Sequence, residues 1–212
     1  MKYFTLIVLT ICGLAACTPK IYQSPDFDKV TRRHKLVAIL PADVAIHLRP
    51  NQMKNLTSEQ IKEQEENTGY EIQEAMYGWL LHRSMNYNYT VKFQDIAKTN
   101  TLLKEADLEY AEIKTKDRNT LAQLLGVDAV IQDITVMDKP MSDGAAIALV
   151  AILGTWGATN KVKTTINIYD GASSDLLWKY DFEASGSVGS STDQLVSALM
   201  RNASRKFPYQ AD

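Results

Sequence analysis

Residues 117–138, DRNTLAQLLGVDAVIQDITVMD, have the pattern of a short helix that leads directly into a strand. Asp117 can cap the helix, which is expected to pack through Leu121, Leu124 and Leu125. Gly126 can take the left-handed conformation that ends a helix, and Asp128 then begins a run of strand residues, DAVIQDITVM. A helix so close to a buried strand favours a fold in which helices pack on a sheet.

Two segments before this unit fit the same architecture. KLVAILPA at 35–42 is a short apolar run that ends at a proline, which is typical of a buried strand. Thr57 and Gln60 form a capping-box pattern, which predicts a long helix to about Met85. The second half of this helix has an apolar stripe that should face the core, while its first half is charged on most sides. Gly69 could separate the two halves.

The remaining elements follow from alternation and spacing. Residues 87–93 alternate as a half-buried strand, and an acidic helical stretch is expected between about 99 and 110. Residues 163–186 read as a hairpin around DGASSD, and a final helix from about Thr192 should bury Leu195, Leu199 and Met200. The order of these elements predicts an α/β fold, a mixed sheet with packed helices.

Both cysteines of the chain, Cys12 and Cys17, lie near its beginning. Lys2, an apolar stretch to Leu14 and two alanines have the layout of a secretory signal peptide over residues 1–16. LAAC at 14–17 matches a bacterial lipobox, so Cys17 is predicted to carry the diacylglycerol and palmitate-type acyl chains of a lipoprotein. A disulfide, a metal pair and an uncleaved apolar anchor are the alternatives.

The residues after Cys17 indicate where the protein is held. Thr18 stands where many proteins retained at the inner membrane have an aspartate, which favours an outer-membrane anchor facing the periplasm. Residues 17–34 are expected to be the lipidated cysteine and a tether, because residues 18–31 contain two prolines and little periodicity. RRHK at 32–35 could touch anionic lipid, but such a run more often marks the solvated start of a strand.

Composition limits the partners. Without residues 1–16 the chain has 22 basic and 25 acidic side chains, a balance that gives no electrostatic footprint for nucleic acid. No repeat or change of composition divides the rest, so residues 35–212 are predicted to form a single domain.

An apolar insert, GAAIALVAILGTWGA at 144–158, interrupts the alternation. As a helix it would span about 22 Å, which is short of the roughly 30 Å of hydrocarbon in a bilayer. Three interpretations stay open: a buried core element, an interface with a partner, and a membrane hairpin supplied by each subunit of a ring.

The sequence contains no catalytic constellation. His34, His47 and His82 lack other metal ligands at metal-site spacing, and neither a G-x-S-x-G nucleophile elbow nor a G-x-x-x-x-G-K-[ST] phosphate loop occurs. GSVGSS at 186–191 lacks the lysine of a phosphate loop and reads as a connector. We therefore expect no enzyme, no cofactor and no metal.

Three stretches together resemble the α/β domain shared by the amino-terminal half of TolB, by LpoB and by CsgG. They are KLVAILPA, LAQLLGVDAVIQDITV and INIYDGASSDLLWKYDFEASG. A similar group is the uncharacterised lipoproteins that accompany CsgG-like proteins. The resemblance implies a non-enzymatic accessory or assembly factor of a secretion or cell-wall complex, with envelope proteins or further copies of itself as partners. The alternative is a CsgG-like oligomeric channel subunit of the outer membrane.

Overall fold

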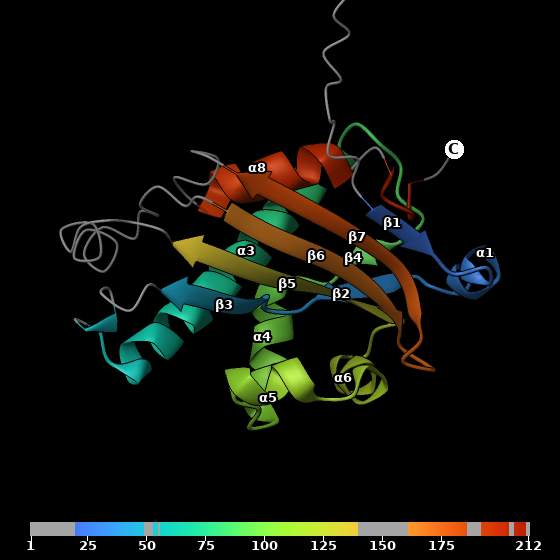
Figure 1. Ribbon diagram of the computed structural model, residues 1–212. Coiled ribbons are helices and arrows are strands. Elements are labelled where there is room, and N and C mark those ends of the chain that lie inside the picture. Colours follow the sequence, from blue (N-terminus) through green and yellow to red (C-terminus); the bar gives the residue numbers. More distant parts are fainter. Residues whose placement is uncertain are drawn as a thin grey trace, which may run out of the picture.

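The computed structural model describes residues 20–48, 53–54, 56–139, 161–185, 192–203 and 206–210. Its centre is a seven-stranded mixed sheet with helices on both faces (Figure 1). The strands are β1 (Lys20–Gln23), β2 (Leu36–Ile39), β3 (Asp43–Leu48), β4 (Lys92–Phe93), β5 (Ala129–Lys139), β6 (Lys161–Asp170) and β7 (Leu176–Ser185). The helices are α1 (Phe27–Thr31), α3 (Ser58–Ser84), α4 (Ile96–Glu105), α5 (Tyr110–Thr115), α6 (Arg118–Leu125) and α8 (Thr192–Ala203). The predicted fold class is confirmed.

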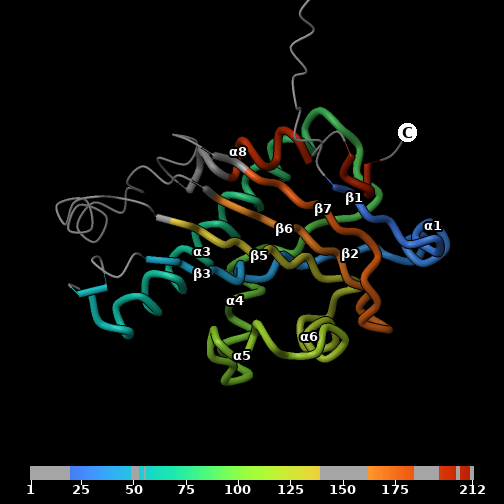
Figure 2. The backbone as a smooth tube through the Cα atoms, viewed as in Figure 1, coloured from blue at the N-terminus to red at the C-terminus, as the bar shows by residue number. Residues whose placement is uncertain are grey.

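The strands follow the order β1-β7-β6-β5-β2-β4 across the sheet. β5, β6 and β7 are antiparallel to one another, whereas β2 and β3 both run parallel to β5 and pair with successive halves of it. Leu40–Ala42 separates these two short strands, and β3 lies beside the second half of β5 at the edge of the sheet (Figure 2).

Two apolar cores hold the layers together. α3 and α8 cover one face of the sheet, where Ile72, Met76, Leu80, Leu199 and Met200 pack against strand residues such as Ile131, Ile166 and Trp178. α4, α5 and α6 cover β2 and the start of β5 on the other face, through Leu103, Ile113, Leu121 and Leu125. Burial of these side chains removes apolar surface from water and is the main stabilising contribution.

The predicted helix ends agree with the structure. The Thr57 hydroxyl accepts from the Gln60 N–H at 3.2 Å, and the Gln60 side chain accepts from the Thr57 N–H at 2.9 Å, so the capping box is formed. Asp117 caps α6 through the Thr120 N–H, and Gly126 has the left-handed φ of 65° that ends it. Leu199 and Met200 are buried as predicted, while the side chain of Leu195 lies outside the described part.

The tether predicted over residues 17–34 differs from the structure from residue 20 onward. Lys20–Gln23 pairs with β7 as β1, Phe27 on α1 is buried in the core, and His34 is buried too. The folded domain therefore begins before residue 35. Sequence periodicity could not reveal this, because β1 has four residues and its pairing partner lies near the other end of the chain.

Residues 43–48, to which the sequence alone assigns no element, form β3, because Val44 and Ile46 alternate into the core. Two further predictions are corrected. Residues 87–93 form only β4 and one bridge between Tyr89 and Gln210. The stretch from 99 to 110 is split between α4 and α5, with Asp107 in a left-handed conformation between them.

α3 is continuous through Gly69. A Cβ added there would lie 2.5 Å from both the Ala42 carbonyl oxygen and the Tyr110 hydroxyl, and the Gly69 carbonyl accepts from the Ala42 N–H. This glycine thus lets the helix approach the backbone between β2 and β3. Within the described residues, no helix combines the length and the apolar character needed to cross a bilayer. The apolar insert at 144–158 lies outside them.

Candidate functional site

Cys17, the predicted lipidation site, lies outside the described residues, which begin three positions later at Lys20. The predicted anchor is nevertheless only three residues from the folded domain, because β1 starts at Lys20 and is paired along its length with β7. The surfaces that β1 presents therefore lie close in the chain to the predicted lipid.

The edge of the sheet at β3 is closed by side chains. The Tyr110 hydroxyl accepts from the Val44 N–H at 3.2 Å, and the Glu65 carboxylate accepts from the Ile46 N–H at 2.9 Å. Lys114 donates to the Val44 carbonyl and forms an ion pair of 2.8 Å with Asp43. An edge whose backbone groups are occupied is protected from pairing with another chain.

The edge of the sheet at β1 is different. The Ser24 N–H donates to the Leu177 carbonyl, so the backbone groups of Tyr22 and Lys20 also face β7, and those of Ile21 and Gln23 point away from it. In the described part of the chain, no backbone hydrogen bond reaches this outer side. Ile21 and Tyr22 are 40% and 47% exposed, which makes β1 an open edge strand with apolar side chains.

A cleft of about 570 Å³ adjoins this open edge, between β1, α1 and the start of β7. Its lining combines both charges with apolar side chains: Tyr22, Ser24, Asp26, Lys29, Val30, Arg33, Asp175, Leu176 and Leu177. Such a lining can pair with the charged and polar side chains of a peptide, while the open strand pairs with its backbone. The β1 edge and this cleft together form the candidate functional site, called the β1 site below.

A buried polar network supports the wall of the β1 site. Arg33 Nη2 lies 2.7 Å from both carboxylate oxygens of Asp170, His34 Nε2 lies 2.9 Å from Asp170 Oδ1, and His34 Nδ1 lies 2.7 Å from the Tyr209 hydroxyl. Ser173 also donates to Asp170 through its N–H and hydroxyl. Burial alone would raise the pKa of Asp170, but hydrogen bonds from His34, Ser173 and Arg33 outweigh it and hold that pKa below its usual value.

The acid, imidazole and hydroxyl of this network stand in the order of a hydrolase triad, yet they have no access to a substrate. His34 and Tyr209 are each 1% exposed, and burial raises the pKa of the Tyr209 hydroxyl. A nucleophile must reach the reacting atom. We therefore assign the network a structural role: it fastens residues 33–34 and the C-terminal segment to the hairpin between β6 and β7.

The network also explains the basic run at 32–35. Arg33 and His34 are bound to Asp170, and the backbone N–H groups of Lys35 and Leu36 donate to the Asp128 carboxylate at 2.7 and 2.9 Å. Asp128 thus aligns the start of β2 with β5. The run leads into β2, which begins at Leu36, so it marks a strand entry as the favoured interpretation had it. It is not solvated throughout, because His34 is buried against Asp170. The sequence hid this contact, because Asp170 lies 136 positions away.

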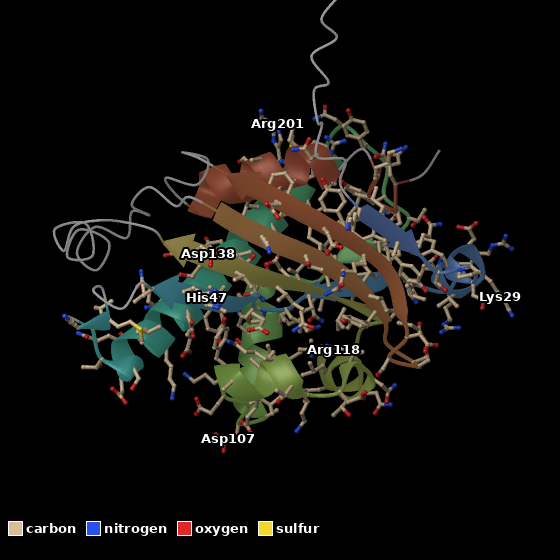
Figure 3. All side chains as sticks on the ribbon, viewed as in Figure 1. Lys29, His47, Asp107, Arg118, Asp138 and Arg201 are labelled. Carbon is tan, nitrogen blue, oxygen red and sulfur yellow. The ribbon has the colours of Figure 1, made fainter. Side chains whose placement is uncertain are left out.

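The other two histidines do not converge with one another or with the aromatic side chains of Tyr87, Tyr89 and Tyr110. His47 on β3 is exposed and lies 3.1 Å from Asp138 (Figure 3), while His82 is exposed on α3. Tyr87 is exposed, Tyr89 packs against Phe93 and Phe207, and Tyr110 is buried behind β3. Among the described residues, no group of three or more histidine, cysteine or acidic side chains could hold a metal ion.

No protein-family model and no curated protein matches this chain. Among solved structures it is similar to a PelC dodecamer from Paraburkholderia phytofirmans, with 11% identity over 92% of this chain and 98% of that one, at a TM-score of 0.42. Lipoprotein GNA1162 from Neisseria meningitidis gives 14% identity, 82% and 97% coverage and a TM-score of 0.43. The LpoB C-terminal domain from Salmonella enterica gives 7% identity, coverage of 76% of this chain and 93% of that one, and a TM-score of 0.39. LpoB is one of the groups that the sequence resembles, but these TM-scores are too low to indicate a function.

Proposed function

We propose that this chain is a non-enzymatic lipoprotein of the bacterial envelope. It is anchored through Cys17, faces the periplasm from the outer membrane and binds an extended segment of an envelope protein at the β1 site. In this role it helps to assemble a secretion or cell-wall complex. The observation that carries the proposal is the open edge of β1 beside a cleft of mixed charge, in a sheet whose β3 edge is closed by side chains.

Addition of a partner's extended segment to the sheet as a further strand beside β1, called strand addition below, accounts for each part of the β1 site. Backbone groups of Ile21 and Gln23 can pair with an extended segment, because they point away from β7. Main-chain hydrogen bonds supply affinity in such complexes, and neighbouring pockets supply specificity. Lys29 and Asp26, both exposed at the cleft, can select a partner that carries opposite charges at matching positions.

The β1 site supports the accessory role, because a single copy of the chain supplies both the open strand and the cleft, and no oligomer is required. The CsgG-like alternative would need the apolar insert at 144–158 to enter the membrane in a ring of subunits.

The proposal is tested by Ile21→Pro in the full-length, lipidated protein. Proline removes an N–H that points away from β7, so the pairing of β1 with β7 is kept while the outer edge loses a donor. The matched control is Ile21→Ala, which shortens the same side chain and keeps the N–H. We expect Ile21→Pro to reduce co-purification of envelope proteins at least tenfold, and Ile21→Ala to reduce it much less.

Equal retention of partners by both variants, with thermal unfolding of both close to that of the parent, would contradict binding at the β1 edge. Equal loss in both variants would assign the effect to the side chain of Ile21 and likewise contradict strand addition.

A further inference from the structure

The turn after α3 exposes apolar side chains at one end of the molecule. Met85 is 80% exposed, and Tyr87 and Leu81 are each 42% exposed. This turn lies at the top of the molecule as drawn, at the end where β1 begins and opposite α5 and α6 (Figure 1). Contiguous exposed apolar side chains mark a contact surface on an otherwise polar protein.

Contacts connect this turn, through the C-terminal segment, to the part of β7 that pairs with the last residue of β1. The Thr90 N–H donates to the Tyr209 carbonyl at 2.8 Å, and the Tyr89 ring lies 5.9 Å from that of Phe207. Phe207 in turn lies 5.9 Å from Trp178, which is opposite Gln23 in the pairing of β7 with β1. The turn, the C-terminal segment and the N-terminal strand are therefore one packed unit.

The turn and the C-terminal segment beside it carry only basic side chains, while Asp181, opposite the start of β1, is bound to Lys179 and Thr165. Residues 81–92 and 206–210 contain His82, Arg83, Lys92 and Lys206 and no aspartate or glutamate. The Arg83 guanidinium lies 4.0 Å from the centre of the Tyr87 ring, which holds a cation beside an exposed aromatic side chain. A combination of tyrosine, an aliphatic side chain and cations suits the headgroup region of a bilayer with anionic lipids.

The chain length to the anchor brings this end to the lipid. Cys17 precedes Lys20 by three residues, which span at most about 11 Å when extended. Since β1 is hydrogen-bonded to β7, this short connection cannot be lengthened without breaking the sheet. A domain so closely attached keeps the end at which β1 begins near the membrane surface.

We propose that the membrane-contact end, defined as residues 81–90 with the start of β1, lies on the anionic phospholipid surface, with Met85 and Tyr87 among the headgroups. This inference rests on the lipidation of Cys17 in the proposed function, and it adds a fixed orientation of the domain. The outer edge of β1 then extends away from the lipid, where a partner can reach it.

Fluorescence of the mature lipidated protein in vesicles tests the orientation. Met85→Cys and, as the matched control, Leu124→Cys each replace an exposed apolar residue, and Leu124 on α6 lies at the opposite end. With Cys12 removed and Cys17 acylated, the new thiol is the single site for an environment-sensitive NBD label. The vesicles contain phosphatidylethanolamine and phosphatidylglycerol, with or without nitroxide-labelled lipid. We expect at least twofold quenching by nitroxide lipid at position 85 and almost none at position 124.

Equal, weak quenching at both positions in vesicles that still float with the protein would overturn the orientation and leave the anchor intact. Quenching at position 85 only in native membranes, and not in vesicles of pure lipid, would show that a protein covers this end and would also overturn the proposal. Flotation of Cys17→Ala, made without residues 1–16, with vesicles that lack phosphatidylglycerol would instead contradict the anchor itself.

Discussion

At the residue scale, Asp170 connects three distant parts of the chain. Its carboxylate accepts from Arg33, His34 and Ser173, and His34 continues the connection to Tyr209. Removing the charge leaves His34 buried with a weaker partner, so Asp170→Asn should lower the free energy of unfolding by about 2–4 kcal/mol. Denaturant unfolding measures this change. Asp175→Asn, in the same hairpin turn but exposed, is the control, and its free energy of unfolding should stay within about 0.5 kcal/mol of the parent's. Equal losses of stability in the two variants would contradict the structural role of the Asp170 network.

A second prediction concerns Asp133, which is fully buried opposite Ile166. Burial raises the pKa of its carboxyl to about 7, against a weaker opposing effect of the hydrogen bond from Thr135. The native state therefore keeps this proton between about pH 4 and 7 while the unfolded state releases it, so this group lowers stability as the pH rises through that window.

Asp133→Asn removes this titration. The variant should gain stability relative to the parent as the pH rises from about 4 to 7, by on the order of 4 kcal/mol at most, because each pKa unit corresponds to about 1.4 kcal/mol. Unfolding midpoints of both proteins across this range provide the measurement. A stability difference that stays constant with pH would show that Asp133 does not titrate in this window.

At the element scale, α3 contains two glycines at which substitution by alanine should change stability in opposite directions. Gly69→Ala places a methyl group against the Ala42 carbonyl and Tyr110, so it should lower the free energy of unfolding by about 1–3 kcal/mol. Gly78→Ala meets no atom within 4 Å and should raise it by about 0.5–1 kcal/mol through helix propensity. Opposite signs in thermal unfolding are expected. A gain in both variants would contradict the close approach of α3 to the segment between β2 and β3.

Local patterns predicted several of these elements well. The capping box at Thr57, the N-cap at Asp117 and the left-handed Gly126 each depend on residues within one helical turn, and all three are formed. The hairpin of β6 and β7 was also predictable, since its two strands are adjacent in sequence. Signals of this kind are complete within a short window of the chain.

Pairings between distant segments were not predictable. β1 and β3 are short and partly polar, and each becomes a strand only because β7 or β5 lies beside it. The candidate site was missed for the same reason: Arg33 and Asp170 are 137 positions apart, and the open edge of β1 exists only once β1 has paired with β7. The sequence did indicate the anchor at Cys17, which stays a prediction.

At the scale of the whole molecule, different surfaces have different proposed tasks. We propose that the end with residues 81–90 contacts lipid and that the β1 site binds a partner, while the β3 edge is closed by Tyr110, Glu65 and Lys114. Two of these surfaces adjoin β1, so the segment next to the anchor both orients the domain and offers its binding edge. This arrangement suits an assembly factor that holds a partner near the membrane.

Photo-crosslinking in cells tests the central claim most directly. A photoreactive amino acid at position 21 is compared with the same amino acid at position 124, in the lipidated protein at its native level. We expect position 21 to crosslink to a distinct envelope protein and position 124 not to do so. The crosslink should be lost when Gln23→Pro removes a second outward N–H. Crosslinks from position 21 only to further copies of the same chain, or equal crosslinking at both positions, would contradict that claim.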